Sequence, residues 1–342
     1  MKPLENADVL LIAPVFFGYD QSIAREIESL GARVRFLADR PFRSSLFRAL
    51  TTKASAATQW YIDRLYARLL GEMSKTFSPA HVLVINGQTL SKRTLCEARR
   101  LFPSAKFTLY LWDSLDNRNS VVDNLNLFDR ILTFDPRDAT KYGLIFRPLF
   151  YVSELTPLAD SQRCRYDLSF IGTCHSDRYA IIHRLLRSSS DKSRLYVYLF
   201  LQGRWVYWIY RLLKPEFRGT KPDDFAYVPL DKATLKSVFD QSAAVLDIEH
   251  PKQSGLTMRT IEAIGARKKL VTTNQNIRDY DFYGDNVHIV DRNNPSIPPG
   301  FLVSPFREYS SNIYAKYAIG GWLREVLDLP APELRRHVDG PC

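Results

Sequence analysis

The stretch that most constrains the fold is residues 244–274, AVLDIEHPKQSGLTMRTIEAIGARKKLVTTN. It begins and ends with short apolar runs, Ala244–Ile248 and Leu270–Thr273, of the kind found in strands buried on both faces. Between them, apolar residues from Met258 to Ile264 recur at helical spacing. A strand, a helix and a second strand joined by short links predict a βαβ unit. Its two strands should be parallel and its crossover right-handed.

The start of this helix has the composition of an anion site. Ser254, Gly255 and Thr257 are small or capping residues where the first backbone amides of a helix lack a helical acceptor. A phosphate can accept from such amides, and the helix dipole favours its charge. Lys252 and Arg259 add positive charge on either side. These five residues are therefore candidates for binding a phosphate.

Glu262 follows Arg259 by three positions, so both project from one side of the predicted helix. From Thr257 to Glu262 the helix rises roughly 7–8 Å, which is a suitable reach from a diphosphate to a ribose diol. This role requires Glu262 to be accessible rather than enclosed in a core. The alternative is an ordinary βαβ unit in which Arg259 and Glu262 form a surface ion pair.

The same alternation of strand and helix runs through the whole chain, which predicts an α/β protein with doubly wound sheets. The expected strands are Val9–Ala13, Val34–Ala38, His81–Ile85, Lys106–Trp112, Arg130–Phe134, Leu144–Arg147, Asp167–Ile171, Leu195–Leu201, Ala244–Ile248, Leu270–Thr273 and Val287–Val290. The expected helices are Asp20–Leu30, Ser44–Phe77, Ser91–Phe102, Asp177–Ser188, Gly203–Lys214, Asp231–Asp240 and Arg307–Leu327, the last with a kink at Gly320-Gly321.

A second glycine turn follows the strand Asp167–Ile171. Gly172, Thr173 and His175 lie between this strand and the next predicted helix. A strand, a tight turn and a helix start again make a concavity that suits an anion. The simpler alternative is that Gly172 only makes the turn and His175 is an exposed loop residue.

Three segments carry a family resemblance. The sequence GLTMRTIEAIGARKKLVTTN, together with YDFYGDNVHIV after it, resembles the donor-nucleotide region of GT-B glycosyltransferases, most closely those of bacterial lipopolysaccharide and capsule biosynthesis. YDLSFIGTCHSDR resembles the opening of the nucleotide-binding domain in the same group. Many retaining members have two glutamates separated by seven residues, and here Ser254 stands at the earlier position, eight before Glu262. The stereochemistry of transfer therefore stays open.

The resemblance implies two Rossmann-like domains that face each other across a cleft. Residues 1–150 would form an acceptor domain, 151–165 a linker, and 166–306 a nucleotide-sugar-binding domain. The helix in 307–330 would cross back to the first domain. The donor would be held by the nine residues Gly172, Thr173, His175, Lys252, Ser254, Gly255, Thr257, Arg259 and Glu262.

An inverting reaction needs a general base on the acceptor side. Asp113 is the first candidate because it ends a predicted strand, where functional groups of α/β sheets collect. Asp20 is the second, and Asp135 a distant third because the following Pro136-Arg137 indicates a helix cap. For each of the three, a non-catalytic role as a helix cap or ion-pair partner is the alternative. A retaining reaction needs no such base, and these residues would then bind only the acceptor.

Composition narrows the setting. The 342 residues are 45% hydrophobic and 25% charged, which is typical of a globular protein with material for two cores. The four cysteines form no CxxC motif, and no clustered DxD follows a strand, so we expect a reduced cytoplasmic chain without a metal or cofactor. No apolar run approaches the ~20 residues of a membrane span, and the N-terminus reads as a strand rather than a signal peptide.

The net charge of +10 favours phosphorylated substrates or an anionic membrane surface over nucleic acid, because the basic residues are dispersed and no nucleic-acid-binding motif is present. Two predicted helices, within Ser44–Phe77 and Gly203–Lys214, combine aromatic and basic residues. Core packing is the default for such aromatics. The alternative is docking on the inner face of a bacterial inner membrane.

The resemblance implies a glycosyltransferase that moves a sugar from a nucleotide-activated donor to a glycan or lipid-linked glycan of the bacterial surface. A nucleotide-sugar epimerase or hydrolase of the same fold and a non-catalytic polyanion-binding module are the alternatives. The sugar and nucleotide stay open among UDP, GDP, dTDP, ADP and CMP. CMP is included because some transferases of acidic sugars use a His-Pro pair near the phosphate, as in His250-Pro251.

Overall fold

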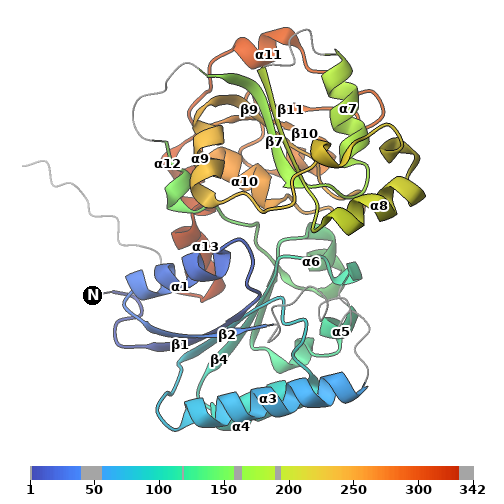
Figure 1. Cartoon of the computed structure of the whole chain (residues 1–342). Coiled ribbons are helices and arrows are strands. Elements are labelled where there is room, and N and C mark those ends of the chain that lie inside the picture. The colour runs from blue at the N-terminus through green and yellow to red at the C-terminus, as the bar shows by residue number, and fades with distance from the viewer. Residues whose placement is uncertain (1, 40–55, 118, 158–163, 189–193, 331–342) are drawn as a thin grey trace, which may run out of the picture. The chain divides into compact units, whose positions relative to one another are not determined.

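The computed structural model describes residues 2–39, 56–117, 119–157, 164–188 and 194–330. The chain divides into two compact units, one made of residues 1–111, 115–132 and 320–342 and the other of 112–114 and 133–319. Each unit combines parallel strands with covering helices (Figure 1). Within the described ranges, no helix is both long enough and apolar enough to cross a bilayer.

The first sheet has six strands in the order β2-β1-β3-β4-β5-β6. They are β1 (Asp8–Ala13), β2 (Arg33–Ala38), β3 (His81–Ile85), β4 (Lys106–Leu111), β5 (Arg130–Thr133) and β6 (Ile145–Phe146). Their helices are α1 (Tyr19–Ser29), α3 (Ala56–Ser74), α4 (Lys92–Leu101), α5 (Asn119–Val122) and α6 (Pro136–Tyr142). The chain leaves β1 in one direction and β3 in the other, so right-handed crossovers place α1 and α4 on opposite faces (Figure 1).

The second sheet has five parallel strands in the order β11-β10-β9-β7-β8. They are β7 (Tyr166–Thr173), β8 (Leu195–Phe200), β9 (Ser242–Asp247), β10 (Lys269–Thr272) and β11 (Val287–Ile289). The associated helices are α7 (Arg178–Ser188), α8 (Arg204–Leu213), α9 (Lys232–Asp240), α10 (Met258–Gly265), α11 (Pro299–Val303) and α12 (Ser311–Tyr317). Short 3-10 helices are η1 (Leu115–Asn117), η2 (Leu125–Leu127), η3 (Ser153–Leu155), η5 (Pro215–Phe217), η6 (Pro222–Asp224) and η7 (Gln275–Asp279).

The central prediction, a parallel βαβ unit in residues 244–274, is confirmed as β9-α10-β10. Because the order of strands reverses between β7 and β9, α7 and α10 cover opposite faces of this sheet (Figure 1). Their N-termini both lie at the carboxyl edge of the sheet. In α/β proteins this reversal of strand order is the position where ligands bind.

The predicted closing helix Arg307–Leu327 is instead two helices, α12 and α13 (Ile319–Val326). The break is at Ala318, which is extended, and not at Gly320-Gly321 as expected. Ala318 forms a parallel bridge with Tyr151, whose amide donates to the carbonyl of Tyr317 while the amide of Ile319 donates to Tyr151. This long-range pairing, invisible to local periodicity, stretches the chain. Gly320 lies inside α13, against the carboxylate of Glu26.

Two expected regions fall partly outside the described residues. The helix within Ser44–Phe77 is observed as α3 from Ala56, and residues 40–55 are not described. In the expected linker 151–165, residues 158–163 are not described, while Tyr151 is buried and η3 follows it. The linker and the domain boundaries therefore stay predictions.

Candidate functional site

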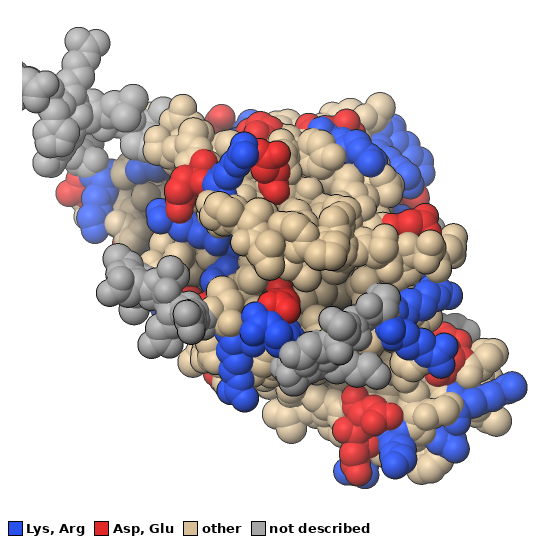
Figure 2. All heavy atoms as spheres, turned by 90° about the horizontal axis from the view of Figure 1, so that it is seen from above, with Lys and Arg blue, Asp and Glu red and all other residues tan. Residues whose placement is uncertain are grey.

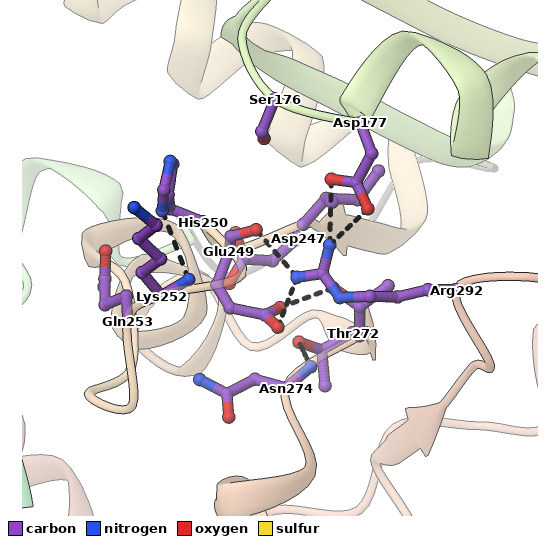
Figure 3. A network of polar contacts seen from close by, with 12 residues as sticks. Ser176, Asp177, Asp247, Glu249, His250, Lys252, Gln253, Thr272, Asn274 and Arg292 are labelled. Carbon is purple, nitrogen blue, oxygen red and sulfur yellow. Dashed lines mark hydrogen bonds and ion pairs between the residues drawn. The ribbon is translucent and has the colours of Figure 1, made fainter.

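Polar side chains from four strands converge at the carboxyl edge of the second sheet (Figure 3). They come from the residues just after β7, β9, β10 and β11. Parallel strands bring their carboxyl ends to the same edge, so residues more than a hundred positions apart in the sequence meet there. This edge is the candidate site, and two strand-to-helix turns form its walls.

The first wall is the end of β7 together with the turn that leads to α7. Gly172 and Thr173 are the last two residues of β7 and pair with β8, so the expected glycine turn at Gly172 is wrong, and His175 lies in the turn itself. All three are partly accessible. The amides of His175, Ser176 and Asp177 donate to no acceptor within the described ranges. Ser176 has φ 50°, a left-handed conformation next to the helix start, and successive amides in such a turn form an anion-binding concavity. The turn therefore holds three backbone donors without an acceptor in the described residues, at partly accessible positions.

Arg178 fixes the shape of this turn from behind. Its Nε donates to the carbonyl of Ile248 at 2.6 Å, and its Nη1 donates to the carbonyl of Thr173 at 3.0 Å. The guanidinium thus ties the end of β7 to the end of β9. Burial lowers its pKa, and the nearby carboxylates of Asp247 and Glu249 oppose that shift. The sequence analysis did not select Arg178, although a basic residue at the first position of a helix after a strand could have marked it as a candidate.

His175 is held as a neutral imidazole. Burial lowers its pKa from 6.5 to about 3, and the positive charge of Arg178 acts in the same direction. Its ring centroid lies 5.7 Å from that of His250, and its Nδ1 is 3.2 Å from the hydroxyl of Ser176. A neutral imidazole can donate or accept a hydrogen bond without adding charge. His175 is partly buried in a loop, so it is less exposed than the simpler alternative assumed, and its role in binding stays a prediction.

Arg292 links the elements of this edge (Figure 3). Its Nη1 lies 2.8 and 2.9 Å from the two carboxylate oxygens of Asp177, and its Nη2 donates to the carbonyl of Glu249 at 2.8 Å and to the Glu249 carboxylate. Thr273 donates to the other oxygen of that carboxylate. Burial alone would lower the pKa of Arg292, but the bonds to Glu249 and Asp177 raise it overall. One guanidinium therefore joins the start of α7 to the end of β9.

The second wall is the β9–α10 turn, where Thr257 caps α10 as predicted by its residue type. Its hydroxyl accepts from the amide of Thr260 at 3.3 Å and donates to the carboxylate of Asp247 at 2.8 Å. Thr260 also donates to Asp247, at 2.6 Å. The carboxylate at the end of β9 thus orients the first turn of the helix.

Asp135 occupies the amides on which the expected phosphate site depended. Its Oδ2 accepts from the amides of Ser254 at 3.2 Å and Gly255 at 3.4 Å, and its Oδ1 accepts from the hydroxyl of Ser254. Asp135 also caps α6 through the amide of Arg137, which is the role that Pro136-Arg137 indicated. A Cβ on Gly255 would lie 2.7 Å from the ring of Phe134. In this arrangement a carboxylate of the chain itself fills the position of an anion.

Arg259 and Glu262 form an ion pair, with Nη1 and Oε2 separated by 2.6 Å. The Glu262 side chain is only 2% exposed, so the accessibility that the ribose role requires is absent in this arrangement. The guanidinium of Arg259 also lies over the ring of Phe239. Its Nε is buried without a hydrogen-bond partner in the described residues. The pair is therefore more enclosed than a surface pair.

The three remaining candidates are Lys252, Asp113 and Asp20. Lys252 is exposed on the loop after β9, and its amide donates to Nδ1 of His250 at 3.2 Å (Figure 3). Asp113 is partly accessible at the end of β4. Asp20 is buried in the first turn of α1, where it accepts from the amide of Phe16 at 3.4 Å. Asp20 is not the N-cap of α1, because Gly18 holds that position and no side-chain cap hydrogen bond is formed there. The catalytic roles of both aspartates stay predictions.

Four charged residues at the site were not predicted: Arg178, Asp247, Glu249 and Arg292. The rule that selected Asp113, a carboxylate at a strand end, applies equally to Asp247 and Glu249 and would have found them. Arg292 had no local signal. Among the described residues, no group of three or more His, Cys, Asp or Glu side chains is placed to hold a metal ion.

No protein-family model matches the sequence, and no curated protein matches it. The fold does match solved structures. These include apo OtsA (TM-score 0.60, 11% identity, 94% of this chain and 98% of that one) and a glycosyltransferase from Rickettsia africae (0.57, 10%, 94% and 97%). Anabaena HepE in complex with UDP and glucose matches similarly (0.57, 10%, 94% and 98%). This chain therefore has two Rossmann-like parallel sheets in a GT-B-like fold, as predicted. At these identities the likeness establishes the fold alone.

Proposed function

We propose that the chain is a glycosyltransferase that uses a nucleotide-activated sugar and binds its diphosphate at the carboxyl edge of the second sheet. The acceptor in this proposal is a glycan or lipid-linked glycan of the bacterial surface. The observation that carries the proposal is the β7–α7 turn, where three successive residues are partly accessible and their backbone amides have no acceptor in the described residues. The match to HepE, whose structure contains UDP and glucose, supports the choice of ligand class.

The donor residues divide into an open group and a closed group. Gly172, Thr173, His175 and Lys252 are accessible and would contact the diphosphate first. Ser254, Gly255 and Glu262 are covered by Asp135 and Arg259, so the diphosphate would bind the open group without displacing that cover. Thr257 and Arg259 lie at the mouth of α10 between these groups.

The transfer chemistry places negative charge on the leaving diphosphate. Amides at the start of α7 and the positive end of its dipole would stabilise that charge as it develops. The neutral ring of His175 would donate to a phosphate oxygen without competing for a proton. If the reaction inverts configuration, Asp113 is the first candidate to deprotonate the acceptor hydroxyl and Asp20 the second.

A panel of nucleotide sugars tests the donor site directly. UDP-, GDP-, dTDP-, ADP- and CMP-sugars are compared by thermal shift, and the best ligand is then titrated by calorimetry against wild type, His175→Ala, Arg259→Ala and Glu262→Ala. His175→Ala should weaken binding most. Arg68→Ala is the matched control, since Arg68 pairs with Glu72 on the exposed surface of α3. Unchanged affinity in all three site variants would reject this location.

Turnover separates transfer from the other reactions of this fold. Asp113→Asn should abolish transfer to a glycan acceptor while leaving donor affinity intact. Retained turnover would move the role to Asp20 or remove it. A rearranged or hydrolysed donor formed without acceptor would favour an epimerase or hydrolase instead. Affinity for polyanions that needs no nucleotide and falls steeply with salt would favour a binding module. On the face shown in Figure 2, basic and acidic side chains are interspersed, which does not favour that module.

A further inference from the structure

Helix α8 has a second apolar face, which the described residues of its unit leave exposed. Its inner face packs into the core of the second sheet through Val206 and Tyr207, which are buried. Its outer face carries Trp205, Trp208 and Leu212, which are 64%, 58% and 80% exposed. Large apolar side chains that lie together outside the core can contact another surface. The outer face of α8 therefore has the composition of a contact surface.

The outer residues form a continuous stripe rather than scattered exposures. Trp205, Trp208, Ile209 and Leu212 are spaced i, i+3, i+4 and i+7, so they lie on one side of the helix. Leu213 continues the stripe at the C-terminal end and is 71% exposed. Single exposed apolar residues need no explanation, whereas a contiguous patch marks an interaction site. We call these five residues the α8 stripe.

Basic residues surround the α8 stripe. Residues 203–221 contain five basic residues, Arg204, Arg211, Lys214, Arg218 and Lys221, and a single acidic one. All but Lys214 are exposed, and Lys214 is partly so. The next two acidic residues are already engaged, since Asp223 pairs with Arg204 and Asp224 accepts from the amide of Lys221. The surroundings of the stripe are therefore positive overall.

We propose that the α8 stripe docks on the surface of an anionic phospholipid bilayer. Indole rings prefer the boundary between headgroups and acyl chains, and a short amphipathic helix lies parallel to that boundary. Basic residues beside the apolar stripe attract anionic headgroups. A second copy of the chain fits less well, because a stable dimer needs about 20–30 residues a side and the stripe offers five.

The position of α8 gives this docking a link to the candidate site. The Nζ of Lys214, which directly follows the helix, donates to the carbonyl of Ser176 at 3.3 Å. Ser176 belongs to the β7–α7 turn. A surface that holds α8 would thus stabilise the turn whose amides face the edge of the sheet. The docking itself needs no nucleotide and does not depend on the proposed reaction.

Vesicle binding tests the proposal without any nucleotide sugar. Full-length protein is sedimented with phosphatidylcholine vesicles and with vesicles in which about a third of the lipid is phosphatidylglycerol. We expect binding to the anionic vesicles, weakened by salt, with a blue shift of tryptophan emission. Trp205→Ser combined with Trp208→Ser should weaken binding by about tenfold or more and remove most of the shift. Arg204→Gln combined with Lys221→Gln should weaken it by about fivefold or more.

Two controls keep the result interpretable. Trp60→Ser removes a tryptophan that is 53% exposed on α3, the other aromatic and basic helix, and it should leave vesicle binding unchanged. Circular dichroism and thermal unfolding should be unaltered in the α8 variants, because the changed side chains are exposed. The proposal is overturned if wild type binds neither vesicle, if Trp60→Ser carries the loss instead, or if the α8 double variant changes only a concentration-dependent mass in light scattering.

Discussion

The two strand-to-helix turns at the carboxyl edge of the second sheet look alike in sequence and differ in structure. Both place small residues between a buried strand and an amphipathic helix. In the β9–α10 turn, the amides of Ser254 and Gly255 are taken by the carboxylate of Asp135. In the β7–α7 turn, the amides of residues 175–177 have no acceptor in the described part of the chain. An anion arriving at this edge would therefore meet amides without an acceptor at the β7–α7 turn and not at the β9–α10 turn.

The difference teaches that a helix start is a ligand site only when the rest of the chain leaves it open. Glycine and capping residues determine where a helix begins. They do not determine whether another side chain has already filled the concavity. At the β9–α10 turn an internal carboxylate fills it, and at the β7–α7 turn two arginines, Arg178 and Arg292, hold the loop from its flanks.

The largest expected effect comes from breaking the Arg292 links. Arg292→Met leaves the carboxylate of Glu249, only 7% exposed, without its cation, and should lower the free energy of unfolding by about 3 kcal/mol. Urea denaturation measures the loss, and hydrogen exchange should accelerate at residues 175–178 more than at 254–257. Arg68→Met, which breaks an exposed pair on α3, should cost about 0.5 kcal/mol or less. Equal exchange at both turns would remove the distinction between them.

The next effect concerns the closed turn. Asp135→Ala removes an acceptor shared by three amides and a hydroxyl, so we expect a loss of about 2 kcal/mol and faster exchange at Ser254 and Gly255. Nucleotide-sugar affinity should stay within about twofold of wild type if the open turn binds the diphosphate. Calorimetry decides this. Tighter binding in the variant would mean that Asp135 blocks the true phosphate position and would reverse the comparison.

The sequence predicts the elements better than it predicts their contacts. Buried strands are recognisable because both of their faces need apolar side chains, and the alternation with helices then restricts the fold. The contact between Asp135 and Ser254 joins residues 119 positions apart. The bridge that breaks the last helix joins Tyr151 to Ala318. Local periodicity contains no information about such pairs, so the closure of one turn and the extension at Ala318 could not be foreseen.

The candidate site shows the same limit in its individual residues. Thr257 caps α10, as its position after a strand and before a helical pattern indicated. Glu262 was chosen by helical spacing, which predicts the side of the helix correctly but not what covers it. Arg292 was not chosen at all, because an arginine after the last strand has no motif. Its importance follows from two carboxylates supplied by other elements.

An effect of intermediate size is the pH dependence of the free energy of unfolding, which reports on His175 in the β7–α7 turn. Because the pKa of His175 falls from 6.5 to about 3 in the folded protein, the unfolded chain binds the extra proton between these values. Stability is therefore lost as the pH falls below 6.5. His175→Asn should remove about 1–2 kcal/mol of the loss between pH 8 and pH 5. Urea midpoints at both pH values measure it. If His175→Asn loses as much stability between pH 8 and pH 5 as the wild type, the imidazole of His175 would be exposed to water in the wild-type protein.

The smallest expected effect concerns Lys252, an exposed residue of the β9–α10 turn. Lys252 is exposed on the loop after β9, so Lys252→Ala should change the free energy of unfolding by no more than about 0.5 kcal/mol. If the diphosphate lies at this edge, removing the charge should weaken nucleotide-sugar binding by about threefold to tenfold at low salt, and less as salt screens the interaction. Calorimetry at two salt concentrations measures both quantities. Lys236→Ala is the matched control, since Lys236 pairs with Asp240 on α9. A loss of affinity that does not respond to salt would argue that Lys252 shapes the loop after β9 rather than attracting the phosphate. The β9–α10 turn would then contribute to binding through its conformation and not through the charge of Lys252.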